Sequence, residues 1–237
     1  SDGTYKVTAA VDELVEDSTN GYKENYTFNI AKSKAVQPGV YTSFKQLITA
    51  MRSNMSGVFK LASDMTADEV GLTDNQTSYL SGEFTGTLIG ADGSKAYAIY
   101  DLRKPLFDTL RGATVKDLDV KNVDIDSDEN AAAIAKVADT AKISNVAVEG
   151  KISGRKSVAG LIVSATNTTI ENSAFTGKLV ANHTDSSAKY ARGIVGNLIG
   201  ENARINKSKV DVKISSSSRN TDQVAGGIVG RLENGAL

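Results

Sequence analysis

The chain has 237 residues, of which 40% are hydrophobic and 23% charged, and its formal net charge is −1. These values fit a folded chain with a core, exclude a disordered polyelectrolyte, and leave no global positive field to attract nucleic acid. No apolar run approaches the ~18 residues of a spanning helix, so no membrane insertion is expected. Frequent glycine, serine, threonine, asparagine and valine favour β structure.

The first predicted element is a β-hairpin segment over residues 1–36. Two runs, 5–11 and 25–30, alternate apolar and polar residues, and the polar stretch between them contains Asn20-Gly21. That pattern is typical of two strands joined by a long loop. A linker around Gln37-Pro38-Gly39 follows it.

Residues 37–104 are predicted to form a capping helix and the first solenoid strands. The helix begins at Ser43-Phe-Lys-Gln46, a capping-box pattern, and ends at or just before Gly57. One face of this helix is apolar, with Phe44, Leu47, Ile48 and Met51. Strands are expected at Val58–Ala62, Phe84–Gly90 and Ala96–Leu102, with a turn at Ala91–Ser94. Because an open coil end is an aggregation-prone edge, we expect the helix to cover it.

Residues 105–237 contain an internal repeat. Four segments align without gaps over six residues, with starts 28, 27 and 35 residues apart: Val115–Val120, Ile143–Val148, Ile170–Phe175 and Ile205–Val210. A second motif precedes each of them and recurs a fifth time: Leu106–Leu110, Ala133–Val137, Gly160–Val163, Gly193–Leu198 and Gly227–Leu232. The fifth copy stops at Leu237, which we interpret as truncation in mid-repeat.

Each repeat holds three short extended runs, and the third alternates strictly, as in Phe175, Gly177 and Leu179. Period two means that one face is buried, and three strands per ~27 residues suit one coil of a parallel β-helix. The predicted fold class is therefore mainly β, a right-handed parallel β-helix or solenoid. No repeat shows helical spacing over ten residues.

Stacking the repeats produces columns of equivalent side chains. Val115, Ile143, Ile170 and Ile205 form a buried column, whereas Lys151, Lys178 and Lys213 form an outward one. Glu149 and Asp211 fall in the neighbouring outward column and partly offset the lysine charges. This column is either a soluble face that protects the sheet or a contact stripe for an acidic partner.

Insertions after the third run collect at one edge of the predicted stack, at 126–130, 154–157, 182–189 and 215–223. They form either a binding edge or a place where length variation is tolerated. His183 and Arg219 fall in two of them. With Lys151, Lys178 and Lys213, these two residues are our candidate partner contacts.

Motifs for chemistry are scarce. The only histidine is His183 and there is no cysteine, so a zinc site of three or four such ligands cannot form and HExxH is absent. We predict no catalytic residue, no metal site and no cofactor in this chain.

Three weaker patterns remain. The acidic run Asp124–Asn130 begins like a calcium loop but has Glu129 where glycine is expected, so a solvated acidic turn is favoured. Ser153-Gly-Arg-Lys156 matches SxxK without its companion motifs and is interpreted as a turn between coils. Glu149 and Asp211, about two strand spacings apart, suggest a polysaccharide-cleaving β-helix only as a rival class.

Three segments in this order carry a family resemblance: Phe84–Gly90, Pro105–Leu118 and Gly226–Asn234. Together with the helix and strand between Tyr41 and Val70, they resemble the N-terminal, non-catalytic region of streptococcal zinc metalloproteases of the immunoglobulin A protease family. The Gly-Ile-Val-Gly repeat alone is less specific, because many bacterial surface solenoids carry it.

The resemblance implies a secreted parent at the bacterial cell surface or cell wall, which cleaves host glycoproteins such as immunoglobulin A with a zinc site far downstream. What it implies for this chain is substrate engagement or spacing, as a monomer whose partners are a host glycoprotein and the rest of the protease. The alternative is a surface adhesin solenoid with no protease attached.

The buried column gives a first test. Ile170→Asp should unfold the stack locally and lower the melting temperature, because a buried carboxylate without a partner is strongly destabilising. Thermal denaturation followed by circular dichroism measures this. A melting temperature equal to that of the wild type would show that the register is wrong.

Overall fold

The computed structural model describes residues 39–92, 95–182, 189–217 and 223–234. The chain divides into two units, Ser1–Ala35 and Val36–Leu237, and all described residues belong to the second. The predicted hairpin over 1–36 lies outside the described residues.

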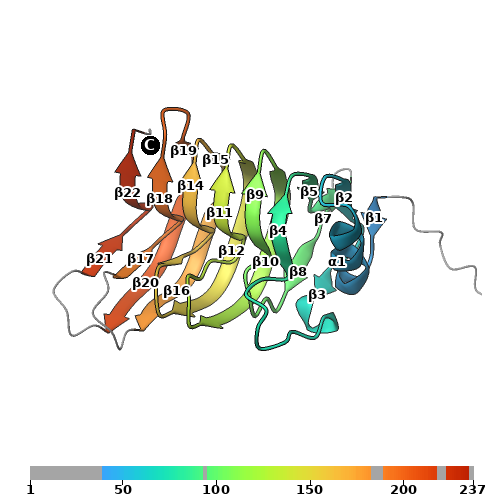
Figure 1. The fold of residues 1–237 in the computed structure, drawn as a ribbon, viewed down its shortest axis with the longest axis horizontal. Coiled ribbons are helices and arrows are strands. Elements are labelled where there is room, and N and C mark those ends of the chain that lie inside the picture. Colours follow the sequence, from blue (N-terminus) through green and yellow to red (C-terminus); the bar gives the residue numbers. More distant parts are fainter. Residues whose placement is uncertain (1–38, 93–94, 183–188, 218–222, 235–237) are drawn as a thin grey trace, which may run out of the picture. The chain divides into compact units, whose positions relative to one another are not determined.

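The second unit is mainly β, and its three larger sheets are parallel (Figure 1). The first sheet runs in the order β1 (Val40–Tyr41), β2 (Val58–Leu61), β5 (Thr87–Ile89), β10 (Thr114–Ser127), β12 (Lys142–Gly154), β15 (Thr169–Glu171) and β19 (Arg204–Asn206). It also includes β3 (Met65–Thr66), β8 (Ala98–Tyr100), β16 (Ala174–Asn182) and β20 (Lys209–Ser217). The mainly-β prediction is confirmed.

The second sheet contains β4 (Leu80–Phe84), β9 (Phe107–Arg111), β11 (Ala135–Asp139), β14 (Ile162–Thr166), β18 (Val195–Ile199) and β22 (Val229–Glu233). The third contains β13 (Val158–Ala159), β17 (Lys189–Arg192) and β21 (Gln223–Gly226). Strands in each large sheet pair with their equivalents in the next repeat, so the repeats stack in chain order (Figure 1).

The register confirms the predicted buried column. Val115 pairs with Ile143, Ile143 with Ile170, and Ile170 with Ile205, and all four are buried. The same column extends backwards through Leu88 to Phe59. A side chain of this size contributes about 1.5–3 kcal/mol when it is buried, so the column is a continuous source of stability.

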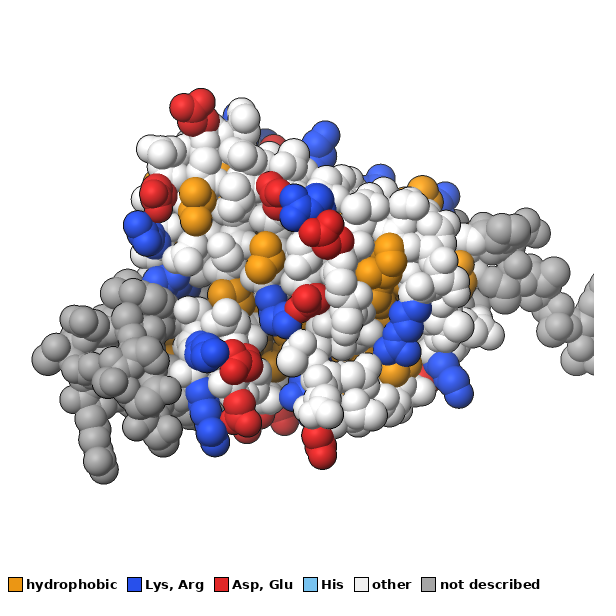
Figure 2. Space-filling view, in the orientation of Figure 1, with side chains coloured by type: hydrophobic (Ala, Val, Ile, Leu, Met, Phe, Trp, Pro, Cys, Tyr) orange, Lys and Arg blue, Asp and Glu red, His pale blue; other side chains and the backbone are white. Residues whose placement is uncertain are grey.

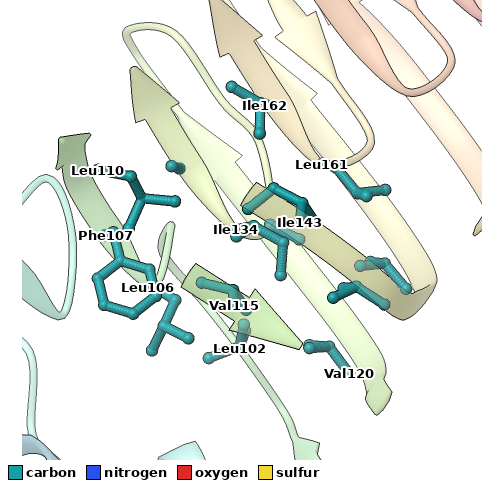
Figure 3. Close-up of a cluster of buried hydrophobic side chains, with 14 of the residues drawn as sticks. Leu102, Leu106, Phe107, Leu110, Val115, Val120, Ile134, Ile143, Leu161 and Ile162 are labelled. Carbon is teal, nitrogen blue, oxygen red and sulfur yellow. The ribbon is translucent and has the colours of Figure 1, made fainter. Parts of the chain in front are cut away.

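Aromatic rings fill the part of the core nearest the first strands. Phe84 lies with its ring centroid 6.0 Å from Phe59 and 4.8 Å from Phe107. Further along, aliphatic residues such as Ile134, Leu161 and Ile162 replace them (Figure 3).

A bend in left-handed backbone conformation recurs in every repeat. Asp117, Asn145, Asn172 and Lys207 are equivalent in the alignment, and their φ angles lie between 47° and 54°. Asparagine and aspartate tolerate this region better than other non-glycine residues. The bends occur within β10 and β12 and between β15 and β16, so the predicted second and third runs are one continuous strand in the earlier repeats.

Helix α1 (Phe44–Ser53) buries Phe44, Leu47, Ile48 and Met51, as predicted. Ser43 is its N-cap and accepts a hydrogen bond from the Gln46 N–H at 3.4 Å. The helix ends with Asn54 as its C-cap, three residues before Gly57. Phe44 packs edge-on against Tyr79, with ring centroids 5.1 Å apart.

The short 3₁₀ helix η1 (Ala67–Glu69) supplies a second group to the start of α1. Glu69 Oε2 accepts hydrogen bonds from Ser43 Oγ at 2.6 Å and from the Lys45 N–H at 3.0 Å. Burial opposes ionisation of Glu69, but these hydrogen bonds outweigh it and lower the pKa of the carboxyl group. The capping carboxylate therefore comes from a separate segment.

The predicted single strand Phe84–Gly90 is wrong. Phe84 ends β4 in the second sheet, and β5 starts at Thr87 in the first. Between them, a Cβ on Gly86 would lie 2.2 Å from the Gly57 carbonyl oxygen, so only glycine permits this turn. The predicted strand Ala96–Leu102 is shorter, since β6 (Ala91–Asp92) and β7 (Lys95–Ala96) pair antiparallel before β8.

Gly177 provides a stability test. Its φ is 139°, and an added Cβ would lie 1.9 Å from the Gly150 carbonyl oxygen. We expect Gly177→Ala to lower the free energy of unfolding by at least about 1 kcal/mol, measured by urea denaturation. Gly71→Ala is the control, because no heavy atom lies within 4 Å of its Cβ. Equal stability of the two variants would contradict the close approach of the coils.

Glu69 provides a pH test. Because its folded pKa is below the unfolded value of about 4.3, its ionisation stabilises the fold above that pH, and this contribution is lost as the pH falls through the folded pKa. The wild-type protein should therefore have a higher melting temperature than the Glu69→Gln variant at pH about 7. This difference in melting temperature should vanish towards pH about 3. A difference independent of pH would rule out the charged cap.

Candidate partner-binding face

The predicted lysine column is in register on the outer face of the first sheet. Lys151 pairs with Lys178, and Lys178 pairs with Lys213, on β12, β16 and β20. All three side chains are exposed. The register also adds an acidic member, because Asp124 on β10 lies opposite Lys151.

The charge on this column is compensated at one end only. Lys151 Nζ lies 3.9 Å from Asp124 Oδ1, and Arg103 also pairs with Asp124 at 3.2 Å. Within the described ranges, no carboxylate oxygen lies within 4.0 Å of the Nζ of Lys178 or Lys213. Two ammonium groups on strands about 4.8 Å apart thus face solvent without an ion-pair partner.

The neighbouring outward column contains Glu149, Thr176 and Asp211 in register. The threonine separates the two carboxylates. Neither carboxylate forms an ion pair among the described residues, so the expected offset of the lysine charges does not take the form of direct contacts.

Elsewhere, opposite charges pair between successive coils. Arg111 bridges Glu83 at 2.9 Å and Asp139 at 2.7 Å. Lys136 pairs with Asp108, Arg155 with Asp128 and Lys156 with Glu129. Charged side chains of both signs are therefore interspersed over the surface, with small hydrophobic patches between them (Figure 2).

The acidic run 124–130 is only partly a turn. Asp124 and Asp126 belong to strand β10. The next two acidic residues, Asp128 and Glu129, form ion pairs with Arg155 and Lys156 respectively. The serine of the SxxK pattern, Ser153, is buried and donates its hydroxyl to Asp126 Oδ1 at 2.7 Å. Both patterns thus serve contact between coils.

His183 and Arg219 lie outside the described residues, as do most of the insertions 182–189 and 215–223. The insertions 126–130 and 154–157 are described and contact each other, with the Lys156 N–H donating to the Glu129 carbonyl at 3.4 Å. Their proposed role as a binding edge stays a prediction.

One buried cation was missed from the sequence. Arg192 on β17 is only 1% exposed, and its Nη1 donates to Asn197 Oδ1 at 2.5 Å. Its register partners are Ala159 and Gly226, so the repeat pattern gives no signal for a buried charge here. A Cβ on Gly230 would lie 1.9 Å from the Arg192 side chain, which explains the second glycine of the last Gly-Ile-Val-Gly.

A zinc site built from three or four histidine and cysteine ligands does not fit this chain's composition. The sequence holds one histidine and no cysteine, and in the described ranges no three His, Cys, Asp or Glu residues are placed to share a metal ion. No helix among the described residues is long and apolar enough to cross a membrane.

Comparisons with known proteins give a consistent result. The family model for the N-terminal region of the M26 IgA1-specific metallo-endopeptidases matches residues 1–150. Zinc metalloprotease ZmpC of Streptococcus pneumoniae serotype 4 (strain ATCC BAA-334 / TIGR4) is 71% identical over 237 residues, which are 100% of this chain and 13% of that protein. An immunoglobulin A1 protease of Streptococcus sanguinis is 41% identical over 234 residues, 98% of this chain and 13% of its own length.

A solved structure of an IgA1 protease matches with a TM-score of 0.79 at 41% identity, over 83% of this chain and 15% of that one. The chain spans about 13–15% of the length of these relatives, and the part of the family that its sequence matches is the N-terminal region. The chain belongs to the M26 family of IgA1-specific metallo-endopeptidases. The predicted resemblance is confirmed, and family membership favours a protease parent over a free-standing adhesin.

Proposed function

We propose that this chain is a non-catalytic solenoid that engages the substrate of a zinc metalloprotease and holds it at a fixed distance. The observation that carries the proposal is the pair of exposed lysines Lys178 and Lys213, which lie in register on neighbouring strands and have no ion-pair partner among the described residues. Zinc and the cleavage chemistry belong to a part of the parent outside these residues.

The proposed architecture is a right-handed parallel β-helix over 105–237, preceded by a capping helix with the first solenoid strands over 37–104 and a hairpin segment over 1–36. Three observations support the cap. The apolar face of α1 is buried, Phe44 packs on Tyr79, and Arg52 Nη2 donates to the Tyr79 carbonyl at 3.0 Å, next to the start of β4.

The proposed partner is a host glycoprotein, immunoglobulin A in the first place, because relatives carry the name immunoglobulin A1 protease. We further propose that the parent is secreted and held at the streptococcal surface or cell wall. There a rigid stack of coils would separate the binding face from the attachment point.

Binding of the purified chain to human immunoglobulin A by surface plasmon resonance tests this proposal. We expect saturable binding that weakens between low and physiological salt, because the lysines are exposed and screened by ions. Lys178→Glu/Lys213→Glu should weaken it by at least about tenfold, the effect of ~1.4 kcal/mol.

Lys60→Glu/Lys142→Glu is the matched control. It makes the same charge change at exposed lysines on β2 and β12, away from the column, and neither lysine has an ion pair in the described ranges. An equal loss of binding in both double variants would show that the effect comes from net charge and not from the lysine column. No saturable binding at either salt concentration would contradict substrate engagement.

A further inference from the structure

A groove crosses the outer face of the first sheet beside the lysine column. It has a volume of about 260 Å³ and is lined by Asp119, Lys121, Ala147, Glu149, Ala174 and Thr176. This is below the range of roughly 300–1,000 Å³ for sites that enclose a drug-sized ligand, so it suits one small unit of a longer chain.

The groove exists because two outward positions carry the smallest side chain with a Cβ. Ala147 and Ala174 are in register on β12 and β16. On either side of them in the same column stand longer residues, Asp119 on β10 and Lys209 on β20. The two alanine methyl groups therefore form the floor of a depression that has a charged side chain on either side.

The polar groups around this floor are available to a ligand. Asp119 is paired with Lys121 at 3.5 Å. In the described part of the chain, by contrast, the side chains of Glu149 and Thr176 have neither a hydrogen bond nor an ion pair. Two residues further along the same strands, Lys151 and Lys178 point to the same side of the sheet.

A peptide is poorly matched to this site. β12 and β16 are hydrogen-bonded to neighbouring strands on both sides, so their backbone cannot accept an added strand. An acidic peptide would also meet the carboxylate of Glu149, because like charges repel. The groove needs a ligand that donates hydrogen bonds at one point and carries negative charge at another.

We propose that this groove binds an acidic saccharide. Sugar hydroxyls would donate to the Glu149 carboxylate and exchange hydrogen bonds with Thr176, while a sugar carboxylate would lie against Lys178. Charge-assisted hydrogen bonds of this kind are the stronger ones available at a protein surface. This proposal deepens the proposed function and rests on it for the source of the ligand, which would be a glycan of the host glycoprotein.

The experiment is an NMR titration of the whole 237-residue chain with 3′-sialyllactose and, as the matched neutral sugar, lactose. We expect shifts confined to residues around Ala147 and Ala174, with lactose at least roughly tenfold weaker. Thr176→Val and Lys178→Gln should each weaken sialyllactose binding several-fold. Lys142→Gln, on the same strand but outside the groove, should not.

The outcomes separate this inference from the proposed function. If sialyllactose does not bind, or binds the Lys178→Gln variant as tightly as the wild type, the proposed saccharide site is overturned. That conclusion holds even if immunoglobulin A still binds. A polyglutamate peptide that shifts the same residues as strongly also overturns it. Saccharide binding without any binding to immunoglobulin A would support the groove and contradict the proposed partner. Deglycosylated immunoglobulin A should bind more weakly than the intact protein.

Discussion

Parallel backbone pairing between equivalent strands is the constraint on which the rest of this structure depends. Because each strand is hydrogen-bonded to its counterpart in the next repeat, an inward side chain always stacks on an inward one and an outward side chain on an outward one. A single register therefore determines the buried column from Phe59 to Ile205 and the exposed column from Asp124 to Lys213. The core and the candidate binding face are two sides of the same pairing.

That pairing also governs how charge is distributed. Where successive repeats carry opposite signs at equivalent or nearby positions, as at Arg111 and Asp139, adjacent strands neutralise one another. Where they carry the same sign, as at Lys178 and Lys213, charge accumulates along the column. The face is therefore specific to the later repeats, although the backbone beneath it is uniform. Outward side chains can therefore differ from repeat to repeat without disturbing the core.

The sequence predicted those features that follow from period two and from equivalence between repeats. The buried column at Ile143 and the lysine column at Lys178 are examples. Residues that align without gaps between repeats are the residues that pair when the repeats stack, so the alignment predicts the strand register. The recurrent bend at Asn145 has a signal in the alignment, because asparagine or aspartate stands at the equivalent position in three of the four copies. Features that depend on packing between segments could not be predicted: the Glu69 cap, buried Arg192, and the depth of a groove that exists only because two alanines stand side by side.

The orientation of the hydrogen bonds has a mechanical consequence. Bonds between equivalent strands point from one repeat to the next, along the direction in which the repeats succeed one another (Figure 1). Tension applied between the two ends of the described stack would load these bonds directly, and each repeat is held mainly by its nearest neighbours. Such a stack would yield one coil at a time, lengthening in steps while the remaining coils kept their outer columns intact.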